Sequence, residues 1–375
     1  MKILFLTPTG ARTGSEMVLW YLIKHLTGNN IKTAVYAREA GELFAKNSPA
    51  DATFYNKFHK GLPYYGVEAV YHRLLGITPE ESYIKRIHQQ FKPDIWYFNT
   101  IVMPQFAQLA RRLGVPYIVH AHELLDTFDT LRADSFSEML GHAQTSIGCA
   151  QVVVDELKKM GTPNVQLLHS FIDTDKIVLT QESNVLKKQL GLPDDAFVWM
   201  MSGTMCMRKG YDMVPELLRH LPKNAYLLWL GSKSEYGVSY YLEQRVKREG
   251  LNFIALGSKG NQDYYDYLNI ADGFVLTSRE DPFPLVMIES AFLQKPIVGF
   301  NSGGISEFVK EGMGAIAPAF DIQGLANIMI DIMDGKRAIN KNTLRQRALE
   351  FDVKNQLPKW LELLKNQIKI EFSQI

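Results

Sequence analysis

The sequence has little cysteine, no excess of charge of either sign and no long apolar run. Cys149 and Cys206 are the only cysteines among 375 residues, and one bridge would add little to a fold of this size. Both are therefore predicted to be reduced packing residues in a reducing compartment. Lysine and arginine number 41 against 40 aspartate and glutamate residues, which argues against a nucleic-acid partner.

The opening MKILFLTPTG is apolar, but Pro8 and Gly10 interrupt it before it reaches the length of a signal sequence. No uninterrupted apolar span of about 18 residues follows, so no transmembrane helix is predicted. We expect a cytoplasmic protein, whose contact with a membrane, if it makes one, is peripheral and at the inner face.

The sequence does contain enough apolar residues for two cores. Hydrophobic residues make up 46% of it and charged residues 22%, which is typical of a soluble globular protein. In each half, apolar runs such as residues 2–7 and 197–203 alternate with segments of helical periodicity. This alternation predicts open α/β sheets of parallel strands, with ligands at the carboxyl ends of the strands. We expect domains at residues 1–178 and 179–355, and a helix at 356–375 that packs back on the first domain.

The segment SREDPFPLVMIESAFLQ places two carboxylates around the start of a helix. Asp281 and Glu289 stand eight residues apart, and this spacing lets both face one ligand. A helix N-terminus attracts phosphate through its unpaired N–H groups and its dipole, so a sugar diphosphate fits here. In the alternative interpretation, the carboxylates only stabilise the helix dipole. The backbone at this helix start belongs to Phe283, Pro284, Leu285 and Val286.

The segment MMSGTMCMRKGYD places two cations after a strand. The strand ends at Gly203, and Arg208 and Lys209 follow in the loop before the next helix. A guanidinium and an ammonium group can together stabilise a leaving nucleoside diphosphate without a metal ion. Such a pair taken alone is more often a solvated surface feature. Its position before a helix, with the carboxylate segment about 70 residues later, favours phosphate binding.

Two strand ends of the first half also carry candidate residues. Gly14 and Ser15 precede the first helix and could offer backbone donors to a phosphate or an acceptor. The glycines do not form a G-x-G-x-x-G fingerprint, which argues against a dinucleotide oxidoreductase. In HAHE, His120 and His122 lie on the same side of a strand end, without a nearby third ligand for zinc. A histidine that is merely hydrogen-bonded at a strand end remains the alternative for His122.

The carboxylate segment resembles the E-x7-E signature of the retaining glycosyltransferases of family 4, with Asp281 in place of the first glutamate. The cationic loop is similar to the family's G-x-x-x-x-x-K-G loop. Thr204 stands where many relatives carry a basic residue, and Arg208 is assigned the missing charge. The resemblance implies that Glu289 holds the ribose hydroxyls of a donor and that Asp281 lies by the transferred sugar as a catalytic residue.

The resemblance extends to the other strand ends. It implies that His122 is a catalytic residue in contact with the sugar or the acceptor, and that backbone groups near Ser258 and Lys259 border the base. The loop at Gly14 and Ser15 resembles the family's GGxE-like loop. The implied architecture is GT-B, an α/β fold in which two Rossmann-like domains face each other across a cleft and the C-terminal helix crosses back to the first domain.

The implied reaction moves a sugar from a UDP- or GDP-sugar to an acceptor hydroxyl with retention of anomeric configuration. It needs no metal ion or other cofactor, and its setting is polysaccharide or glycolipid biosynthesis. The acceptor is a carbohydrate, a glycolipid or a small molecule. Residues 57–75 mix basic and aromatic side chains, and we interpret them either as a surface excursion or as a contact with a membrane face.

Four other functions fit parts of the pattern. A GT-B nucleotide-sugar epimerase or an inverting transferase shares the architecture without requiring this carboxylate spacing. A two-lobed sugar-binding protein also has paired α/β domains, but it normally carries an export signal. An oxidoreductase fits only at the level of the fold.

Overall fold

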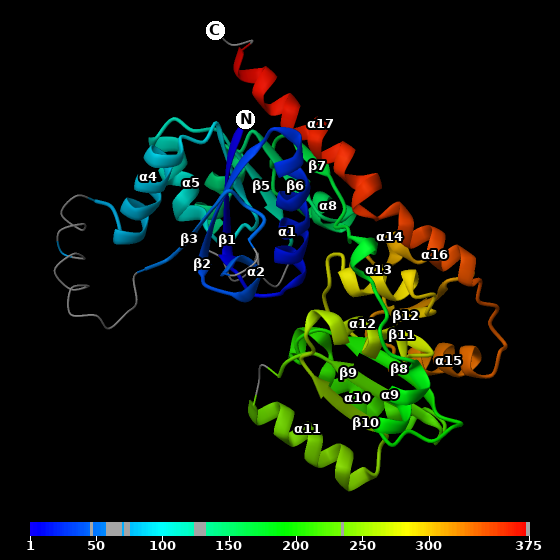
Figure 1. The fold of residues 1–375 in the computed structure, drawn as a ribbon. Coiled ribbons are helices and arrows are strands. Elements are labelled where there is room, and N and C mark those ends of the chain that lie inside the picture. The colour runs from blue at the N-terminus through cyan, green and yellow to red at the C-terminus, as the bar shows by residue number, and fades with distance from the viewer. Residues whose placement is uncertain (46–47, 58–69, 71–75, 124–132, 234–235, 373–375) are drawn as a thin grey trace. The chain divides into compact units, whose positions relative to one another are not determined.

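The computed structural model describes residues 1–45, 48–57, 70, 76–123, 133–233 and 236–372. Its contacts divide the chain into two units (Figure 1). Unit 1 comprises Met1–Ser170 with Gln356–Ile375, and unit 2 comprises Phe171–Asn355. Of the basic and aromatic segment expected at residues 57–75, all but positions 57 and 70 lie outside the described residues.

Unit 1 is built on a seven-stranded sheet in the order β3-β2-β1-β4-β5-β6-β7, in which every neighbouring pair is parallel. The order reverses between β1 and β4, and ligands of such sheets bind outside the carboxyl ends of the strands at this switch point. The strands are β1 (Lys2–Thr9), β2 (Lys32–Glu39), β3 (Ala52–Tyr55), β4 (Ile95–Phe98), β5 (Tyr117–Ala121), β6 (Thr145–Gly148) and β7 (Val165–Leu167).

Unit 2 repeats this arrangement with a six-stranded parallel sheet in the order β10-β9-β8-β11-β12-β13. Its switch point lies between β8 and β11. The strands are β8 (Phe197–Ser202), β9 (Ala225–Leu230), β10 (Phe253–Gly257), β11 (Gly273–Leu276), β12 (Ile297–Phe300) and β13 (Gly314–Ala317). Two parallel α/β sheets confirm the predicted fold class.

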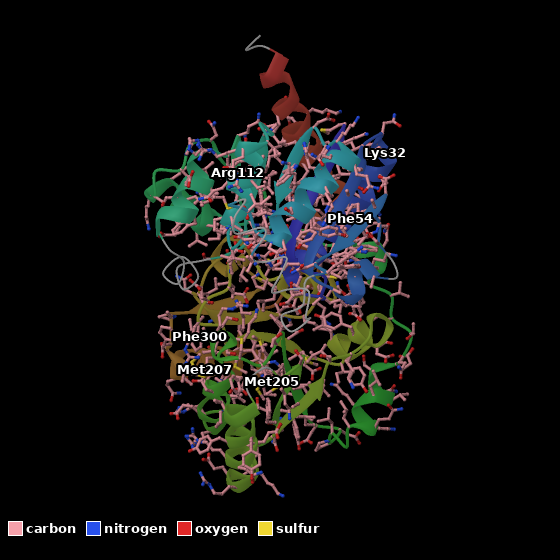
Figure 2. All side chains as sticks on the ribbon, turned by 90° about the vertical axis from the view of Figure 1, so that its left-hand side faces the viewer. Lys32, Phe54, Arg112, Met205, Met207 and Phe300 are labelled. Atoms are coloured by element: carbon pink, nitrogen blue, oxygen red, sulfur yellow. The ribbon has the colours of Figure 1, made fainter. Side chains whose placement is uncertain are left out.

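The central strands are apolar throughout because both faces of each sheet are covered. All four residues of β4, with the sequence IWYF, are buried, and so are all four of β11, GFVL. Side chains fill the space around both sheets (Figure 2). Met205, in the loop after β8, is fully buried, whereas Met207 is 40% exposed, so the chain turns outward within this loop.

Helices connect the strands, and local sequence signals fix several of their ends. Thr78 and Glu81 form a reciprocal capping box at the start of α4, and Asp321 and Asn340 cap α15 and α16 with their side chains. The helices of unit 1 are α1 (Gly14–Leu26), α2 (Glu42–Ala45), α4 (Pro79–Phe91), α5 (Pro104–Arg112), α7 (Ala133–Gly141) and α8 (Gln151–Lys159). Those of unit 2 are α9 (Ser183–Gln189), α10 (Val214–Arg219), α11 (Tyr236–Glu249), α12 (Asn261–Asn269), α13 (Leu285–Phe292), α14 (Ile305–Phe308), α15 (Ile322–Met333) and α16 (Lys341–Glu350).

The last helix, α17 (Val353–Phe372), begins in unit 2 and continues into unit 1. Trp360 is fully buried, and its ring lies 5.0 Å from that of His120 and 6.3 Å from that of Tyr97, measured between centroids. The side chains that α17 buries from Gln356 onward therefore help to complete the core of unit 1. None of the helices within the described ranges is long and apolar enough to cross a membrane.

The structure adds two edge strands that the apolar pattern did not predict. β3 forms one edge of the first sheet and β13 one edge of the second. The contact-based division falls after Ser170, whereas the sequence suggested a boundary after residue 178. Cys149 and Cys206 are free thiols, as predicted.

Candidate functional site

In unit 2, the loops that follow β8 and β11 meet at the switch point through a salt bridge between Lys209 and Asp281. Their side chains are only 11% and 7% exposed. Ser278 also donates a hydrogen bond of 3.1 Å to the same Asp281 oxygen, Oδ2. The two predicted donor-site motifs are thus brought together by a direct contact between a cation and a carboxylate.

Backbone contacts fix the two loops further. Thr277 Oγ1 donates to the carbonyl of Lys209 at 2.8 Å, and the N–H of Arg279 donates to the carbonyl of Arg208 at 2.8 Å. The exposed Arg208 guanidinium donates to the carbonyl of Glu280 at 2.9 Å. The predicted cation pair is therefore divided: Lys209 points inward to Asp281, and Arg208 stays at the surface.

Two glycines, Gly210 after β8 and Gly303 after β12, let their loops approach the loop after β11. At Gly210, φ is +73°, and a Cβ would lie 2.1 Å from the carbonyl oxygen of Thr277. At Gly303, φ is +142°, and a Cβ would lie 2.0 Å from the carbonyl oxygen of Asp281. A larger residue at either position would both strain the backbone and push the loops apart. Gly203 lies close to the side chain of Lys209, because a Cβ at this glycine would be 3.2 Å from Lys209 Cε.

Glu289 projects from α13 and is held by two tyrosines of α12. The Tyr264 hydroxyl donates to Glu289 Oε2 at 3.0 Å and the Tyr265 hydroxyl to Oε1 at 3.2 Å. Because Tyr264 donates its proton to the carboxylate, the 3.1 Å contact between Ser202 Oγ and Tyr264 must be a donation from the serine. Glu289 is thereby linked to the end of β8 beside Gly203.

The residues at the start of α13, before Glu289, include buried and partly exposed side chains. Phe283 is buried, and its ring packs 5.2 Å from Phe351 and 6.3 Å from Phe308 between centroids. Pro284 is the N-cap of α13, followed by the half-buried Leu285 and the buried Val286. The side chains of Phe283 and Val286 therefore anchor the start of the helix.

The remaining predicted donor residues follow β10. Ser258 is exposed, and the Lys259 ammonium lies 4.3 Å above the centroid of the Tyr267 ring. Tyr267 belongs to α12, the helix that also carries Tyr264 and Tyr265. The loop after β10 and the carboxylate of Glu289 are therefore both tied to one helix.

In unit 1, the predicted residues Ser15 and His122 are joined through a buried asparagine. Asn99, directly after β4, donates from Nδ2 to the carbonyl of Ser15 at 3.2 Å. Its Oδ1 lies 3.2 Å from Nε2 of His122, directly after β5. The start of α1, which follows β1, and the loops after the neighbouring strands β4 and β5 thus share one side chain.

The next residue in each of the loops after β4 and β5 also makes a contact between the two loops. Thr100 donates from Oγ1 to one oxygen of Glu123, and the N–H of His122 donates to the other oxygen at 2.8 Å. Burial raises the pKa of Glu123 to about 7 despite these donors. Burial also lowers the pKa of His122 to about 3, so its imidazole is neutral at physiological pH.

A second carboxylate, Glu16, lies at the start of α1 and is 2% exposed. Thr7 and Ser15 donate to it at 2.8 and 2.7 Å, and Thr13 contacts it as well. Burial raises its pKa. Glu16 therefore ties the first turn of α1 to β1. Gly14 and Ser15 are the first two residues of this helix and do not precede it, as the sequence had suggested.

His120 has a different role from His122. It is 1% exposed, its Nδ1 lies 2.9 Å from the Tyr97 hydroxyl, and its ring makes an edge-to-face contact with Trp360. Burial lowers its pKa well below the usual range. Both rings do lie on one side of the strand, with centroids 3.7 Å apart, but His120 is a core residue.

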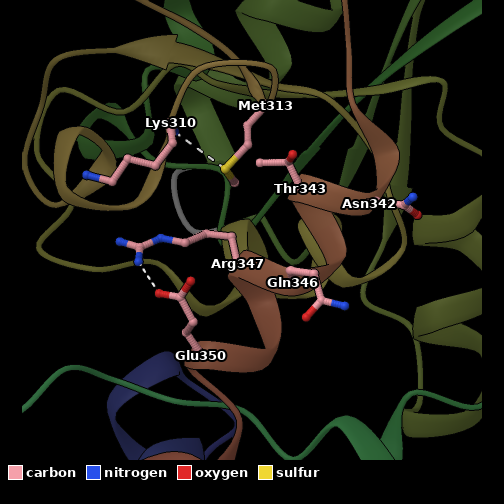
Figure 3. Close-up of a pocket in the computed structure, with 7 residues that line it drawn as sticks. All are labelled: Lys310, Met313, Asn342, Thr343, Gln346, Arg347 and Glu350. Atoms are coloured by element: carbon pink, nitrogen blue, oxygen red, sulfur yellow. Dashed lines mark hydrogen bonds and ion pairs between the residues drawn. The ribbon is translucent and has the colours of Figure 1, made fainter.

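Two pockets lie away from these residues. One of about 330 Å³ in unit 2 is bordered by Met313, which directly precedes β13 (Figure 3). In this pocket the Arg347 guanidinium points to Glu350 and also donates to two backbone carbonyls. The other pocket, of about 720 Å³ in unit 1, is bordered by Met1 and Ile31, which precede β1 and β2. Both therefore lie at the amino edges of the sheets, opposite the candidate residues.

Sequence reasoning missed the residues that orient the predicted ones. The partners of Glu289 could have been suspected from the tyrosine pair in QDYYDYL, and Glu16 from its place in the glycine-rich loop. Asn99 and Thr100 give no such signal, because their contacts depend on how the loops after β4 and β5 leave the sheet. The missed residues are Glu16, Asn99, Thr100, Glu123, Ser202, Tyr264, Tyr265 and Ser278.

Several proteins of known name have sequences similar to this chain. The alpha-galactosylglucosyldiacylglycerol synthase of Streptococcus pneumoniae is 24% identical over 254 residues, which are 62% of this chain and 68% of that protein. The N-acetyl-alpha-D-glucosaminyl L-malate synthase of Bacillus anthracis is 24% identical over 203 residues, 53% of this chain and 52% of that protein. The chain thus spans about half the length of the Bacillus relative.

Solved structures show the same fold over the whole chain. Anabaena HepE in complex with UDP-glucose superposes with a TM-score of 0.82 at 21% identity, covering 98% of this chain and 100% of that one. Sucrose-phosphate synthase from Thermosynechococcus elongatus gives a TM-score of 0.78 at 15% identity, covering 99% and 100%.

Two family models account for most of the sequence. Glycosyltransferase Family 4 matches residues 12–176, and Glycosyl transferases group 1 matches residues 182–350. The chain therefore belongs to glycosyltransferase family 4 and has the GT-B fold, with one Rossmann-like domain in each unit.

Proposed function

We propose that this protein transfers a sugar from a UDP- or GDP-sugar to an acceptor hydroxyl with retention of anomeric configuration, in polysaccharide or glycolipid biosynthesis. The observation that carries the proposal is the buried pair of Lys209 and Asp281, with Glu289 eight residues further on in α13. This arrangement combines a cation for phosphate with two carboxylates for hydroxyl groups.

In the proposed donor complex, Lys209 and Arg208 neutralise the diphosphate. An ammonium group has three donor hydrogens, so Lys209 can keep its contact with Asp281 while it binds a phosphate oxygen. The first turn of α13 adds backbone N–H groups and the positive end of the helix dipole. These charges support a reaction that needs no metal ion. Glu289 accepts hydrogen bonds from the ribose, and Asp281 lies by the transferred sugar.

The remaining residues have lesser roles in this proposal. Backbone groups near Ser258 and Lys259 border the base, and Gly203 leaves room for the diphosphate. The acceptor is assigned to unit 1, where His122 lies at the carboxyl edge of the sheet and is assigned to contact with the sugar or the acceptor. Gly14 and Ser15, at the start of α1, are assigned to the donor, through its distal phosphate. A carbohydrate, a glycolipid or a small molecule with a free hydroxyl fits this assignment.

The proposed step breaks the bond between the anomeric carbon and the diphosphate and forms a bond from that carbon to the acceptor oxygen on the same face. The proton of the acceptor hydroxyl passes to the departing diphosphate oxygen. Positive charge beside the leaving group stabilises the transition state, because the negative charge on the diphosphate grows as the bond breaks. The complexes of Anabaena HepE with UDP and with UDP-glucose support a nucleotide-sugar donor.

A thermal-shift panel of UDP, GDP, ADP and their sugar conjugates, without metal and then with magnesium, tests the proposal. A ligand that binds the native state raises its apparent stability, so a shift with one nucleotide class in the absence of metal is expected. Stabilisation by free sugars or by nicotinamide dinucleotides alone would contradict it. A cytoplasmic location, with contact at the inner membrane face, stays a prediction.

A further inference from the structure

The hydrogen bonds around Asn99 determine which way its side-chain amide points. The Ser15 carbonyl can only accept a hydrogen bond, so the group 3.2 Å from it must be the amide nitrogen Nδ2. The other end of the amide, Oδ1, then faces His122 Nε2 at 3.2 Å. Because Oδ1 can only accept, His122 Nε2 must carry a proton.

The His122 imidazole is also neutral. Its ring centroid lies 3.7 Å from that of His120, which is buried, and two imidazolium rings at that distance would repel each other strongly. Burial lowers the pKa of His122 to about 3. The carboxyls that face this region are Glu123, whose pKa burial raises to about 7, and Glu16, whose pKa is raised as well. A carboxyl with a raised pKa is more readily protonated and uncharged. Glu123 and Glu16 therefore stabilise a charged imidazole less than ordinary carboxylates would.

A neutral imidazole with its proton on Nε2 has a lone pair on Nδ1. Among the described residues, the structure gives Nδ1 of His122 no hydrogen-bond partner, and the side chain is only half-buried. This nitrogen can therefore accept a hydrogen bond from a ligand, and it cannot donate one.

We propose that Asn99 is a positioning residue that fixes the tautomer of His122, so that Nδ1 accepts a hydrogen bond from a ligand hydroxyl. The proposal rests on the proposed function for the kind of ligand, a sugar or an acceptor with a free hydroxyl. The direction of the bond determines selectivity, since an analogue with an O-methyl group or fluorine in place of that hydroxyl cannot donate to Nδ1. Loss of about 1.4 kcal/mol at this contact corresponds to tenfold weaker binding.

The neighbouring contact between the same two loops, from Thr100 to Glu123, supplies a matched control. Thr100 is 2% exposed and Asn99 1% exposed, and both bridge the ends of β4 and β5. Thr100→Val removes the contact with Glu123 and leaves the Asn99 amide in place. Asn99→Leu removes the acceptor for Nε2–H, and Asn99→Asp keeps an acceptor but introduces a negative charge.

The test is the long-range 1H–15N correlation spectrum of the full chain with 15N-labelled histidine, in which His122→Gln identifies the resonances of His122. We expect the free protein and Thr100→Val to show a neutral ring with its proton on Nε2 from pH 8 to pH 5. In Asn99→Leu the proton should move to Nδ1 or exchange between the two nitrogens. Asn99→Asp should retain it on Nε2 and raise the pKa of His122.

A proton on Nδ1 in the wild-type protein, an imidazolium ring at pH 7, or the wild-type spectrum in Asn99→Leu would overturn the proposal. The spectrum is recorded without nucleotide. A thermal-shift panel that finds no nucleotide ligand would therefore count against the proposed function and leave the assignment of the tautomer standing.

Discussion

Lys209 binds Asp281 across the switch point of the second sheet, although 72 residues separate them in the sequence. The contact joins the loop after β8 to the loop after β11, so the same pair fixes the geometry of both motifs. A buried ion pair adds little stability over an apolar pair of the same shape, but removal of one partner leaves a buried charge uncompensated.

Replacement of Lys209 by Met should therefore lower the free energy of unfolding by about 3 kcal/mol and abolish nucleotide binding. Lys187→Met is the matched control, because its salt bridge with Asp272 is 26% and 36% exposed and should contribute about 1 kcal/mol or less. Urea denaturation and nucleotide titration calorimetry measure the two effects. Equal losses of stability in both variants would show that the Lys209 pair is not buried in solution.

Glu289→Gln should keep the fold and weaken nucleotide binding about tenfold or more, because the ribose loses a charged acceptor. Tyr264 and Tyr265 can still donate to the amide oxygen, although one tyrosine contact has to adjust. Glu311→Gln, at an exposed position before β13, is the control. Unchanged nucleotide affinity in Glu289→Gln would contradict the assignment of the ribose site.

Gly210→Ala should destabilise unit 2 by clearly more than Gly191→Ala. Both glycines have left-handed backbones, with φ of +73° and +68°, so both substitutions cost about 1 kcal/mol in strain. Only at Gly210 would the new Cβ collide with a carbonyl oxygen, 2.1 Å away, whereas nothing lies within 4 Å of it at Gly191. Denaturation midpoints that fall equally would show that the loop after β8 can move away from β11.

Glu123 and His122 should give opposite pH dependences of stability. The pKa of Glu123 is raised from 4.5 to about 7, so the stability associated with the protonated carboxyl is present below pH 4.5 and is lost as the pH rises towards 7. The pKa of His122 is lowered from 6.5 to about 3, so its contribution is present above pH 6.5 and is lost as the pH falls towards 3.

Relative to the wild type, Glu123→Gln should therefore be more stable at pH 8 than at pH 4.5, by about 1–2 kcal/mol after solvent screening. His122→Gln should show the reverse order. Free energies of unfolding at the two pH values measure both differences. A difference that does not change with pH in either variant would show that the group titrates normally in the folded protein.

Trp360→Ala should lower the stability of unit 1 by about 3–5 kcal/mol, since a fully buried ring against His120 and Tyr97 is lost. Lys359→Ala removes a neighbouring side chain on the outer part of the same helix and should cost less than about 0.5 kcal/mol. Calorimetric unfolding of the two variants gives the comparison. A small loss for Trp360→Ala would mean that α17 does not contribute to the core of unit 1 in solution.

The two candidate loops of unit 2 could be picked out from the sequence because the residues within each lie close together in the chain. Glu289 follows Asp281 by eight residues, and Arg208 and Lys209 are adjacent. The sequence could not show that Lys209 pairs with Asp281 while Arg208 stays at the surface. That difference depends on how closely the loop after β8 approaches the loop after β11 at Gly210.

The structure of the first unit was harder to predict. Asn99 contacts His122 and Thr100 contacts Glu123, each beyond the partner to which the register of β4 against β5 would lead, so the contacts depend on how the two loops leave the sheet. The apolar pattern did not predict the edge strands β3 and β13, for another reason. Each has only four residues, and most of them are half-buried at a sheet edge, so they lack the continuous apolar run that marks the central strands.

The return of α17 to unit 1 affects the order of events during synthesis. Unit 2 occupies one continuous stretch, so all of its residues leave the ribosome before Trp360 does. Until then, the buried rings of Tyr97 and His120 lack the side chain that covers them. The unit that is translated first would therefore be the one completed last, and an apolar surface beside Tyr97 and His120 would stay available to chaperones while the nascent chain grows.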